Sequence, residues 1–340
     1  MKAFFLEDYG RTGIRDIPKP ELKPGSALIR IQSVSICGSD ISAYRKKGVP
    51  ATVPLILGHE IAGVIEEIYA GASTELKPGD RVILDPYLYC GHCYPCSLGR
   101  TNCCETLKVL GVRNVDGAMS EYFVHPVKNL VKLGDSLPWD VAPIAEPLTI
   151  SLHALHRTQL KAGEKAVIIG AGPIGLLAAM AAKVYGAEPI LVDIIPSRLS
   201  YARQLGIPLT VNPAVCDPVA QIAELTGGRM AEVVVEASGS NAAIQQTLDY
   251  ASYCGRIALT GWPTGETALT TSTITRKEIN LYGSRTSVGE FEEAIALIES
   301  GQVDARAVLT EVVPFDRLPE MMRNMSEHPE KYLKVVALLE

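Results

Sequence analysis

The sequence lacks the charge pattern of a nucleic-acid-binding protein. Its 32 lysine and arginine residues are outnumbered by 38 aspartate and glutamate residues, which gives a formal net charge of −6. It also lacks any block of five or six like charges, so the pattern indicates no charged tail. Because phosphate binding requires a clustered positive excess, we expect no nucleic-acid partner.

Long apolar runs are also missing. The apolar stretch near the N-terminus covers residues 3–6 and is followed by Glu7 and Asp8, whereas a signal peptide needs a longer apolar core. The uncharged run at 166–182 contains three glycines and a proline, which fits a strand, a turn and a helix better than a membrane span. We therefore expect a cytoplasmic protein with no membrane association.

Internal repeats and low-complexity segments are absent, so the chain is not a repeat array. Its 340 residues are comfortable for two domains. Short apolar-rich runs bounded by turn residues predict strands at 26–34, 61–69 and 81–85. We interpret residues 1–150 as a barrel-like β domain with long functional loops.

The pattern changes after Glu146. Short buried-strand runs then alternate with helical segments such as 175–185 and 198–205, which predicts βαβ units and a parallel sheet. The fold class is therefore α/β, with a doubly wound Rossmann sheet beside the β-rich domain. The predicted domains are 1–150, then 151–285 for the parallel sheet, then a tail at 286–340 that returns to the β-rich domain. The predicted strands of the parallel sheet are 165–169, 190–192, 232–236, 256–259 and 279–282.

Five of the eight cysteines lie between residues 90 and 104. Two residues separate Cys90 from Cys93 and Cys93 from Cys96, and Cys104 follows after seven more. Four thiolates in this arrangement can close a tetrahedron around Zn²⁺ and leave no position for water, so the predicted role is structural. Cys103 is the rival for the fourth position. The alternatives are reduced buried thiols, or a zinc ribbon that binds nucleic acid.

A glycine-rich segment indicates a dinucleotide site. A G-x-G-x-x-G pattern lies between a predicted strand and a predicted helix, where the backbone N–H groups of a helix N-terminus can bind a pyrophosphate. Asp193 ends the next strand, 18 residues after Gly175, and an acid there accepts hydrogen bonds from the ribose 2′-OH. The next two residues, Ile194 and Ile195, supply no cation for a 2′-phosphate, which favours NAD over NADP. Arg198 is a candidate for the adenosine side, or a solvated helix residue, and a plain glycine-rich turn is the alternative for the whole motif. The fingerprint residues are Gly170, Gly172, Pro173, Ile174 and Gly175.

Three further segments offer metal ligands. They are 37–40 with Cys37, 58–60 with His59 and Glu60, and 146–147 with Glu146. Spacing alone does not show that they meet, and a lone cysteine or histidine is more often a core residue. With the cysteine loop and the glycine motif, however, they stand in one order over essentially the whole chain. In that order and spacing the sequence resembles the zinc-containing medium-chain dehydrogenase/reductase family. It is most similar to the polyol and sugar-acid branch, and residues 98–105 and 277–285 are most like the L-galactonate type.

The resemblance implies a GroES-like catalytic domain and a second, catalytic zinc held by Cys37, His59 and either Glu60 or Glu146. It also implies that a substrate hydroxyl binds this zinc in the cleft between the domains and that its carbon passes a hydride to NAD. Ser39 matches the residue that contacts the substrate oxygen. The predicted cofactors are thus two zinc ions per chain and NAD.

Other assignments stay open at this point. Asp40 is expected either to orient His59 or to cap a turn. Ser42 stands where many members have a relay histidine, so the proton path is unassigned. Ser284 and Arg285 are candidates for contact with the cofactor or with a substrate carboxylate.

The expected function is NAD-linked oxidation of a secondary hydroxyl of a polyol or sugar acid, with an L-galactonate 5-dehydrogenase-like activity favoured. L-threonine dehydrogenase is the alternative within the family. A zinc-free quinone or enone reductase and a non-catalytic sensor of zinc and NAD are the others. The resemblance further implies a homo-oligomer, either a dimer or a tetramer.

Overall fold

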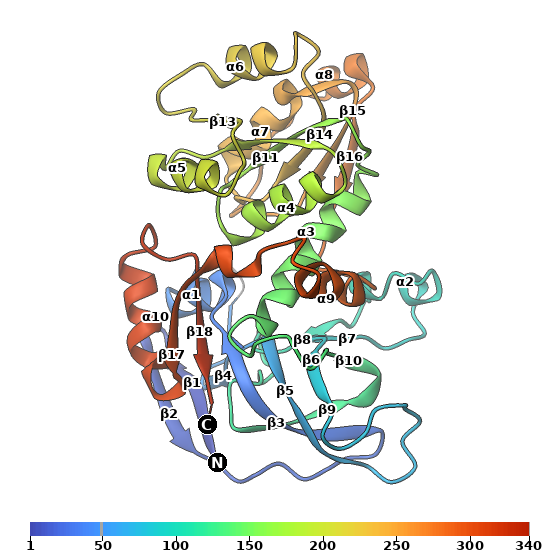
Figure 1. Ribbon diagram of the computed structural model, residues 1–340, viewed down its shortest axis with the longest axis vertical. Helices are drawn as coiled ribbons and strands as arrows, with labels where there is room; N and C mark the ends of the chain where they lie inside the picture. The colour runs from blue at the N-terminus through green and yellow to red at the C-terminus, as the bar shows by residue number, and fades with distance from the viewer. Residues whose placement is uncertain (48–49, 340) are drawn as a thin grey trace. The chain divides into compact units, whose positions relative to one another are not determined.

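The computed structural model describes residues 1–47 and 50–339, which form two compact units (Figure 1). Unit 1 comprises Met1–Glu146, Phe291–Glu299 and the described residues from Leu309 onward, and unit 2 comprises Pro147–Glu290 and Ser300–Val308. The boundaries predicted from the sequence lie after residues 150 and 285.

Residues 300–308 differ most from the predicted division, because they lie in unit 2 and not with the tail. The physical reason is local packing. The turn η4 (Ala305–Val308) lies against helix α4 (Pro173–Val184), and the Tyr201 hydroxyl donates to the Ala307 carbonyl at 2.7 Å. The segment therefore completes the surface of the parallel-sheet unit.

Unit 1 is built on a seven-stranded sheet in the order β10-β6-β5-β3-β18-β17, with β9 also paired to β3. The predicted strands appear as β3 (Ser26–Ser35), β5 (Glu60–Ile68) and β6 (Arg81–Leu84). The sheet is buried against a core of aliphatic side chains that includes Ile31, Leu57 and Met321. Its other strands are β9 (Tyr122–Pro126), β10 (Leu130–Lys132), β17 (Leu309–Pro314) and β18 (Lys334–Leu338).

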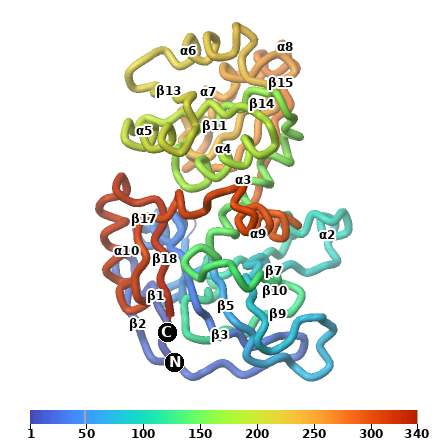
Figure 2. Tube along the Cα trace, viewed as in Figure 1, coloured from blue at the N-terminus to red at the C-terminus, as the bar shows by residue number. Residues whose placement is uncertain are grey.

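Smaller elements complete unit 1. Helix α10 (Leu318–Glu327) packs on helix α1 (Gly38–Tyr44) and on strand β2 (Figure 2). Its apolar face supplies three buried methionines to the core.

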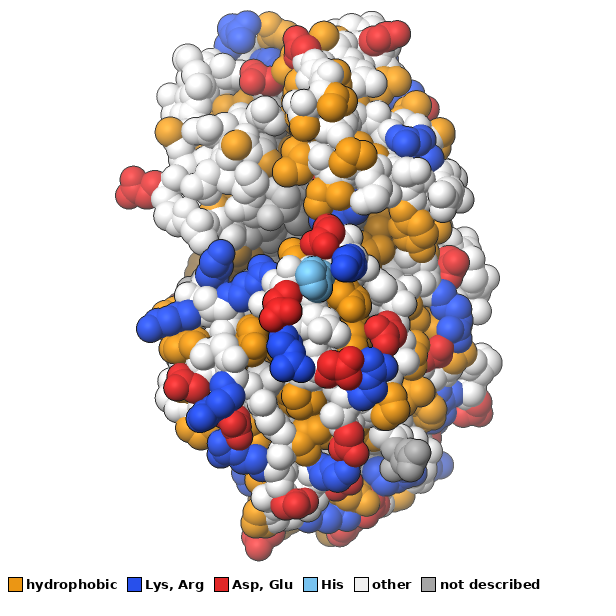
Figure 3. Space-filling model, turned by 90° about the vertical axis from the view of Figure 1, so that its left-hand side faces the viewer, with side chains coloured by type: hydrophobic (Ala, Val, Ile, Leu, Met, Phe, Trp, Pro, Cys, Tyr) orange, Lys and Arg blue, Asp and Glu red, His pale blue; other side chains and the backbone are white. Residues whose placement is uncertain are grey.

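Lysine and arginine side chains are interspersed with acidic ones on the face of unit 1 in Figure 3. The remaining elements are β1 (Lys2–Asp8), β2 (Arg11–Asp16), β4 (Leu55–Ile56), β7 (Tyr87–Leu88), α2 (Tyr94–Ser97), η1 (Thr101–Cys103), β8 (Lys108–Val109), η2 (Val127–Asn129), η3 (Ala142–Ile144), α9 (Phe291–Glu299) and η5 (Phe315–Arg317).

Two registers in unit 1 bring distant segments together. Strand β5 runs antiparallel to β3, with Ser35 opposite Glu60, and β18 runs antiparallel to β3 on its other side, with Val336 opposite Ser35. Three strand ends therefore lie side by side at one end of the sheet: the start of β5, the end of β3 and the start of β18. Helix α1 begins just after this end of β3.

Unit 2 is a six-stranded, all-parallel sheet in the order β13-β12-β11-β14-β15-β16. This arrangement confirms the α/β Rossmann fold predicted from the alternating pattern. Helix α3 (Ala145–Arg157) leads into it. The other elements are β11 (Lys165–Ile169), β12 (Glu188–Val192), α5 (Pro196–Gln204), β13 (Thr210–Val211), α6 (Pro218–Leu225), β14 (Ala231–Glu236), α7 (Asn241–Tyr250), β15 (Ala251–Leu259), α8 (Thr271–Lys277) and β16 (Asn280–Gly283).

Among the described helices, none combines the length and the apolar character that a bilayer crossing requires.

Candidate catalytic and cofactor sites

The structure brings three of the candidate catalytic ligands together. One ligand atom from each of Cys37, His59 and Glu60 lies within 4.8 Å of the others. Cys37 caps the N-terminus of α1 just after β3, and Glu60 opens β5. The β3–β5 register described above therefore explains why residues far apart in sequence meet here. His59 is 7% exposed and Glu60 is fully buried.

Asp40 caps a turn, the second of its two expected roles, and lies near His59 without a hydrogen bond to it. Its Oδ2 accepts the backbone N–H of Cys37 at 2.9 Å, which caps α1, and its Oδ1 lies 3.9 Å from Nδ1 of His59. Burial alone would lower the pKa of His59, but the negative charges of Cys37 and Asp40 outweigh burial and hold that pKa well above its ordinary value. The negative charges of the cluster thus favour the positively charged form of the His59 imidazole.

Glu146 stands slightly apart from the other three ligands. It lies in the first turn of α3, is buried, and its Oε1 accepts a hydrogen bond from the Tyr87 hydroxyl. Burial and the nearby charge of Glu60 raise the pKa of Glu146 to about 7. It is not within the 4.8 Å group that the described residues form around Cys37.

Lys334 is a member of this cluster that the sequence did not reveal. Its side chain is 3% exposed, and its Nζ forms an ion pair with Oε1 of Glu60. Burial lowers the pKa of Lys334, but the charges of Glu60 and Cys37 prevail and raise it. Lys334 is therefore a buried cation beside the candidate ligands.

Two serines near the cluster differ in what they contact. The Ser39 hydroxyl lies 3.3 Å from Nε2 of His59, so it faces the candidate ligands. The Ser42 hydroxyl instead donates to the carbonyl of Gly38 at 2.9 Å. The hydroxyl hydrogen of Ser42 is therefore directed at its own helix and not at the candidate ligands.

The four predicted cysteines converge as well. One sulfur from each of Cys90, Cys93, Cys96 and Cys104 lies within 4.8 Å of the others. Cys93 lies 3.5 Å from Cys96 and 3.8 Å from Cys104, measured between sulfurs. Backbone N–H groups also point at two of the sulfurs, from Cys90 to Cys104 at 3.3 Å and from Cys93 to Cys90 at 3.4 Å. Cys103, the rival, is outside this group of described residues.

In unit 2 the glycine fingerprint has the expected geometry. Gly170 has a φ of +102° at the end of β11, and Gly172 caps α4 with Pro173 as the first helical residue. A Cβ on Gly175 would lie 1.7 Å from the Gly170 carbonyl oxygen, so only glycine fits there. A Cβ on Gly172 would meet nothing within 4 Å, which leaves room for a ligand at the helix N-terminus.

Asp193 lies beside this turn. Its Oδ2 accepts the backbone N–H of Ala171 at 2.7 Å, and its Oδ1 accepts that of Ile195 at 2.8 Å. Arg198 approaches the same carboxylate at 3.9 Å. A cavity of about 260 Å³ opens here, lined by residues that include Gly170, Asp193, Ile194, Pro213 and Ser238.

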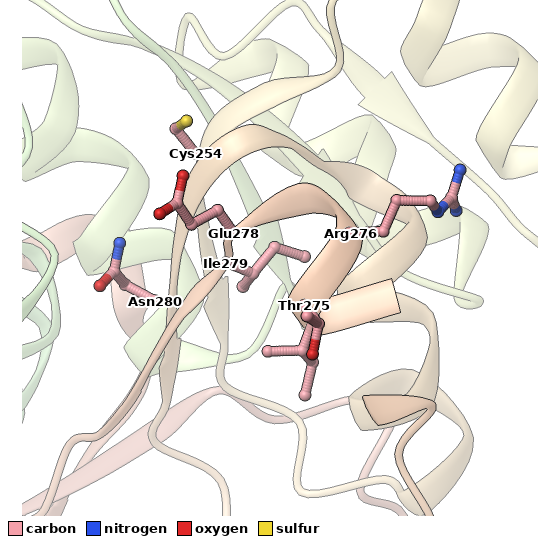
Figure 4. A pocket seen from close by; sticks show the side chains of 7 residues that line it. Cys254, Thr275, Arg276, Glu278, Ile279 and Asn280 are labelled. Carbon is pink, nitrogen blue, oxygen red and sulfur yellow. The ribbon is translucent and has the colours of Figure 1, made fainter. Parts of the chain in front are cut away.

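Ser284 and Arg285 lie elsewhere on the same sheet. They follow β16, which is separated from β11 by β14 and β15, and neither lines the 260 Å³ cavity. Ser284 is buried, and Arg285 is exposed. A larger cavity of about 670 Å³ is lined by residues that include Cys254 and Glu278. These two side chains lie close together in Figure 4. None of the predicted site residues lines this cavity.

Comparison with known proteins identifies the family. Residues 23–135 match the alcohol dehydrogenase GroES-like domain, and residues 173–300 match the zinc-binding dehydrogenase family. An uncharacterized zinc-type alcohol dehydrogenase-like protein of Haemophilus influenzae is 54% identical over 338 residues, which cover 99% of this chain and 98% of that protein. The chain belongs to the zinc-type alcohol dehydrogenase family.

Other dehydrogenases match over most of their length. The L-galactonate-5-dehydrogenase of Escherichia coli is 37% identical over 308 residues, covering 90% of this chain and 89% of that protein. The sorbitol dehydrogenase of Bacillus subtilis is 33% identical over 342 residues, covering 99% and 96%. Among solved structures, the Escherichia coli alcohol dehydrogenase RspB in complex with NADH has a TM-score of 0.93 at 29% identity, and covers 100% of this chain and 99% of its own.

Family membership confirms the predicted reaction class. The protein is an NAD-dependent oxidoreductase that acts on a CH–OH group, with zinc and NAD as cofactors. It also confirms that the β-rich unit is a GroES-like domain. The comparisons therefore support a zinc-dependent dehydrogenase and not the alternative hypothesis of a zinc-free quinone or enone reductase.

Both cysteine-containing clusters fit zinc. Around Cys37, buried atoms lack hydrogen-bond partners among the described residues, namely His59 Nδ1, Glu60 Oε2 and Asp40 Oδ1, as expected of a site that needs a cation. For the quartet, a Zn–S distance of about 2.3 Å gives a tetrahedral edge of roughly 3.8 Å. The sulfur separations of 3.5 and 3.8 Å agree with that edge.

Unit 2 contains a network of two histidines and a glutamate that no sequence motif indicates. Nδ1 of the buried His153 lies 2.8 Å from Oε1 of Glu290, and Nδ1 of the more exposed His156 lies 3.5 Å from the same oxygen. Burial opposes ionisation of Glu290, yet the hydrogen bonds from both histidines lower its pKa to about 2. Nothing in the local pattern pairs residues so distant, so only the fold reveals the network.

Proposed function

We propose that the protein oxidises a secondary hydroxyl of a polyol or sugar acid with NAD⁺, or reduces the matching ketone with NADH, and that L-galactonate is the favoured substrate. The observation that carries the zinc chemistry is the convergence of the half-buried Cys37 with the buried His59 and Glu60 within 4.8 Å. The substrate class is supported by the relatives named for L-galactonate and sorbitol.

We assign the catalytic zinc to Cys37 and His59 with a buried glutamate as third protein ligand. A zinc ion held there supplies a Lewis acid that eases deprotonation of an alcohol near neutral pH. In this proposal Asp40 fixes the orientation of the His59 ring from 3.9 Å. Burial of His59 and Glu60 keeps bulk water away from the reacting atoms.

Ser39 is the first proton acceptor in this proposal. Its hydroxyl lies 3.3 Å from His59 Nε2, which places Ser39 Oγ next to the ligand cluster, where it hydrogen-bonds the substrate hydroxyl and takes its proton. The hydroxyl hydrogen of Ser42 is directed at the Gly38 carbonyl, so we do not assign Ser42 as the next acceptor. The proton therefore leaves Ser39 through water or the cofactor ribose.

The cofactor is assigned to the β11–α4 turn of unit 2. Gly172 and Gly175 let the pyrophosphate approach the N-terminus of α4, and Asp193 accepts hydrogen bonds from the adenosine ribose. We keep Arg198, Ser284 and Arg285 as candidate cofactor residues, since Arg198 neighbours Asp193 and the other two follow β16.

We assign a second, structural zinc to Cys90, Cys93, Cys96 and Cys104, whose four sulfurs leave no open coordination position. We also propose a homodimer or homotetramer, which light scattering showing a monomer would refute. The cytoplasmic location stays a prediction.

The deciding experiment measures NAD⁺ reduction against a panel of hexonates, polyols, polyol phosphates and L-threonine, alongside zinc content by elemental analysis. We expect two zinc ions per chain and the highest kcat/KM on L-galactonate or a related sugar acid or polyol. Highest turnover on L-threonine would refute the substrate class. NADH binding without turnover on any panel member would instead favour a sensor.

A further inference from the structure

Two buried glutamates flank the proposed catalytic zinc site, and each has a different partner. Glu60 is fully buried, with Oε1 paired to Lys334 and Oε2 without a hydrogen-bond partner among the described residues. Glu146 is 1% exposed, and its Oε1 accepts the hydroxyl hydrogen of Tyr87. One carboxylate therefore has a vacant oxygen, whereas the other is held by a neutral donor.

The geometry of the cluster follows the same division. The vacant oxygen belongs to the glutamate that lies within 4.8 Å of the Cys37 and His59 ligand atoms, and Glu146 is outside that group of described residues. Both residues are buried glutamates, so their side-chain type does not select between them. The choice of the metal ligand between Glu60 and Glu146 must therefore depend on the residue that holds each carboxylate.

Tyr87 is a rigid tether. It lies in β7, which pairs with β8, and its ring is 4% exposed. Its backbone N–H donates to Oδ1 of Asp85 at 3.0 Å, and its carbonyl accepts from Nδ2 of Asn129 at 3.1 Å. With the backbone held on both sides and the ring packed, the hydroxyl has a fixed position, and it points at Glu146.

We propose that Tyr87 is a positioning residue that holds Glu146 outside the zinc ligand set, so that Glu60 is the third protein ligand. Because Glu146 lies outside the group around Cys37, either of its oxygens could reach the metal only if the carboxylate moved, and that movement would draw Oε1 away from the buried Tyr87 hydroxyl, which is unfavourable in a site closed to water. Lys334 complements this tether, because it neutralises one oxygen of Glu60 and leaves the other for the metal. This inference rests on the proposed catalytic zinc site.

The test uses the full-length protein with Co²⁺ in place of the catalytic zinc, because the visible absorption of Co²⁺ reports the number and type of its ligands. Tyr87→Phe removes only the hydroxyl. We expect it to change the Co²⁺ spectrum and to shift the metal affinity, measured by chelator competition, by about 10-fold or more, because the released Glu146 carboxylate can then reach the metal. Tyr89→Phe is the matched control, since the Tyr89 ring packs against the Lys128 ammonium at 4.1 Å and not against the cluster. It should match the wild-type spectrum.

Two further variants separate a positioning role from a general structural one. If Tyr87 acts through Glu146, then Tyr87→Phe should change neither spectrum nor affinity further in a Glu146→Ala background. Glu60→Ala should weaken metal binding more than Glu146→Ala. A wild-type spectrum for Tyr87→Phe, or greater loss in Glu146→Ala than in Glu60→Ala, would overturn the inference.

Failure of the proposed zinc site would look different. Cys37→Ala should reduce the zinc content from two ions per chain to one. If Cys37→Ala retains both ions, the site assignment itself is wrong. If it loses one ion while Tyr87→Phe behaves as wild type, only the role of Tyr87 is wrong.

Discussion

Replacement of Lys334 by methionine tests how the buried ion pair with Glu60 contributes to stability. Both side chains are within 3% of full burial, and the pair joins β18 to the start of β5. Methionine keeps the apolar stem but leaves a buried carboxylate without its cation. Loss of one partner from a buried pair costs about 3–5 kcal/mol. For a domain of this size, that corresponds to a fall of roughly 6–20 °C in melting temperature.

The assay is thermal unfolding of the purified protein, which is monitored by calorimetry with and without zinc. The effect should be largest in zinc-free protein, because in the proposed site a bound cation also contacts Glu60 and offsets part of the lost charge. Lys331→Met is the control, since Lys331 is exposed on the preceding turn, and its effect should stay within about 0.5 kcal/mol. If Lys334→Met melts within about 2 °C of Lys331→Met in zinc-free protein, the reasoning about the buried pair is refuted.

Four other outcomes follow from the structure. Cys37→Ala should abolish turnover while the circular dichroism spectrum stays that of the wild type. Cys93→Ala should instead lower the melting temperature, because a closed zinc site supplies folding energy; unchanged melting would contradict a structural role. Asp193→Asn keeps an acceptor but removes the charge, so discrimination against NADPH, measured by fluorescence titration, should fall about tenfold or more. Because the folded-state pKa of Glu290 is lowered to about 2, its contribution to stability is present above the ordinary value of 4.5 and is lost as pH falls toward 2. His153→Ala should make the urea midpoint depend less on pH in that window, and an unchanged slope would argue against the pairing.

Local sequence patterns predicted the parts of the candidate sites whose residues lie close together in sequence. One strand, one turn and one helix fix the positions of Gly170 and Gly175, and the next strand ends at Asp193, so the dinucleotide site was predictable from spacing. The quartet of Cys90 to Cys104 occupies one loop and was predictable for the same reason. Each of these signals needs only a few consecutive elements of known geometry.

The catalytic cluster was not predictable from spacing, because its members meet only through sheet register. Cys37 and Glu60 are neighbours because β3 and β5 pair with Ser35 opposite Glu60. A shift of one residue in that register would point Glu60 to the other face of the sheet. Resemblance to a family was needed to join these segments. Tyr87 and Lys334 have no motif of their own, so neither pattern nor resemblance indicated them.

The pairing of β18 with β3 has a consequence for synthesis of the protein. Lys334 is encoded after the whole of unit 2, whereas Cys37 and Glu60 come before it. As the ribosome delivers the chain in order, the parallel sheet of unit 2 can close while the earlier ligands still lack their buried cation. The order of translation thus allows two events to be separated in time: the β11–α4 turn can form first, and the charge balance around Cys37 and Glu60 can be completed only afterwards.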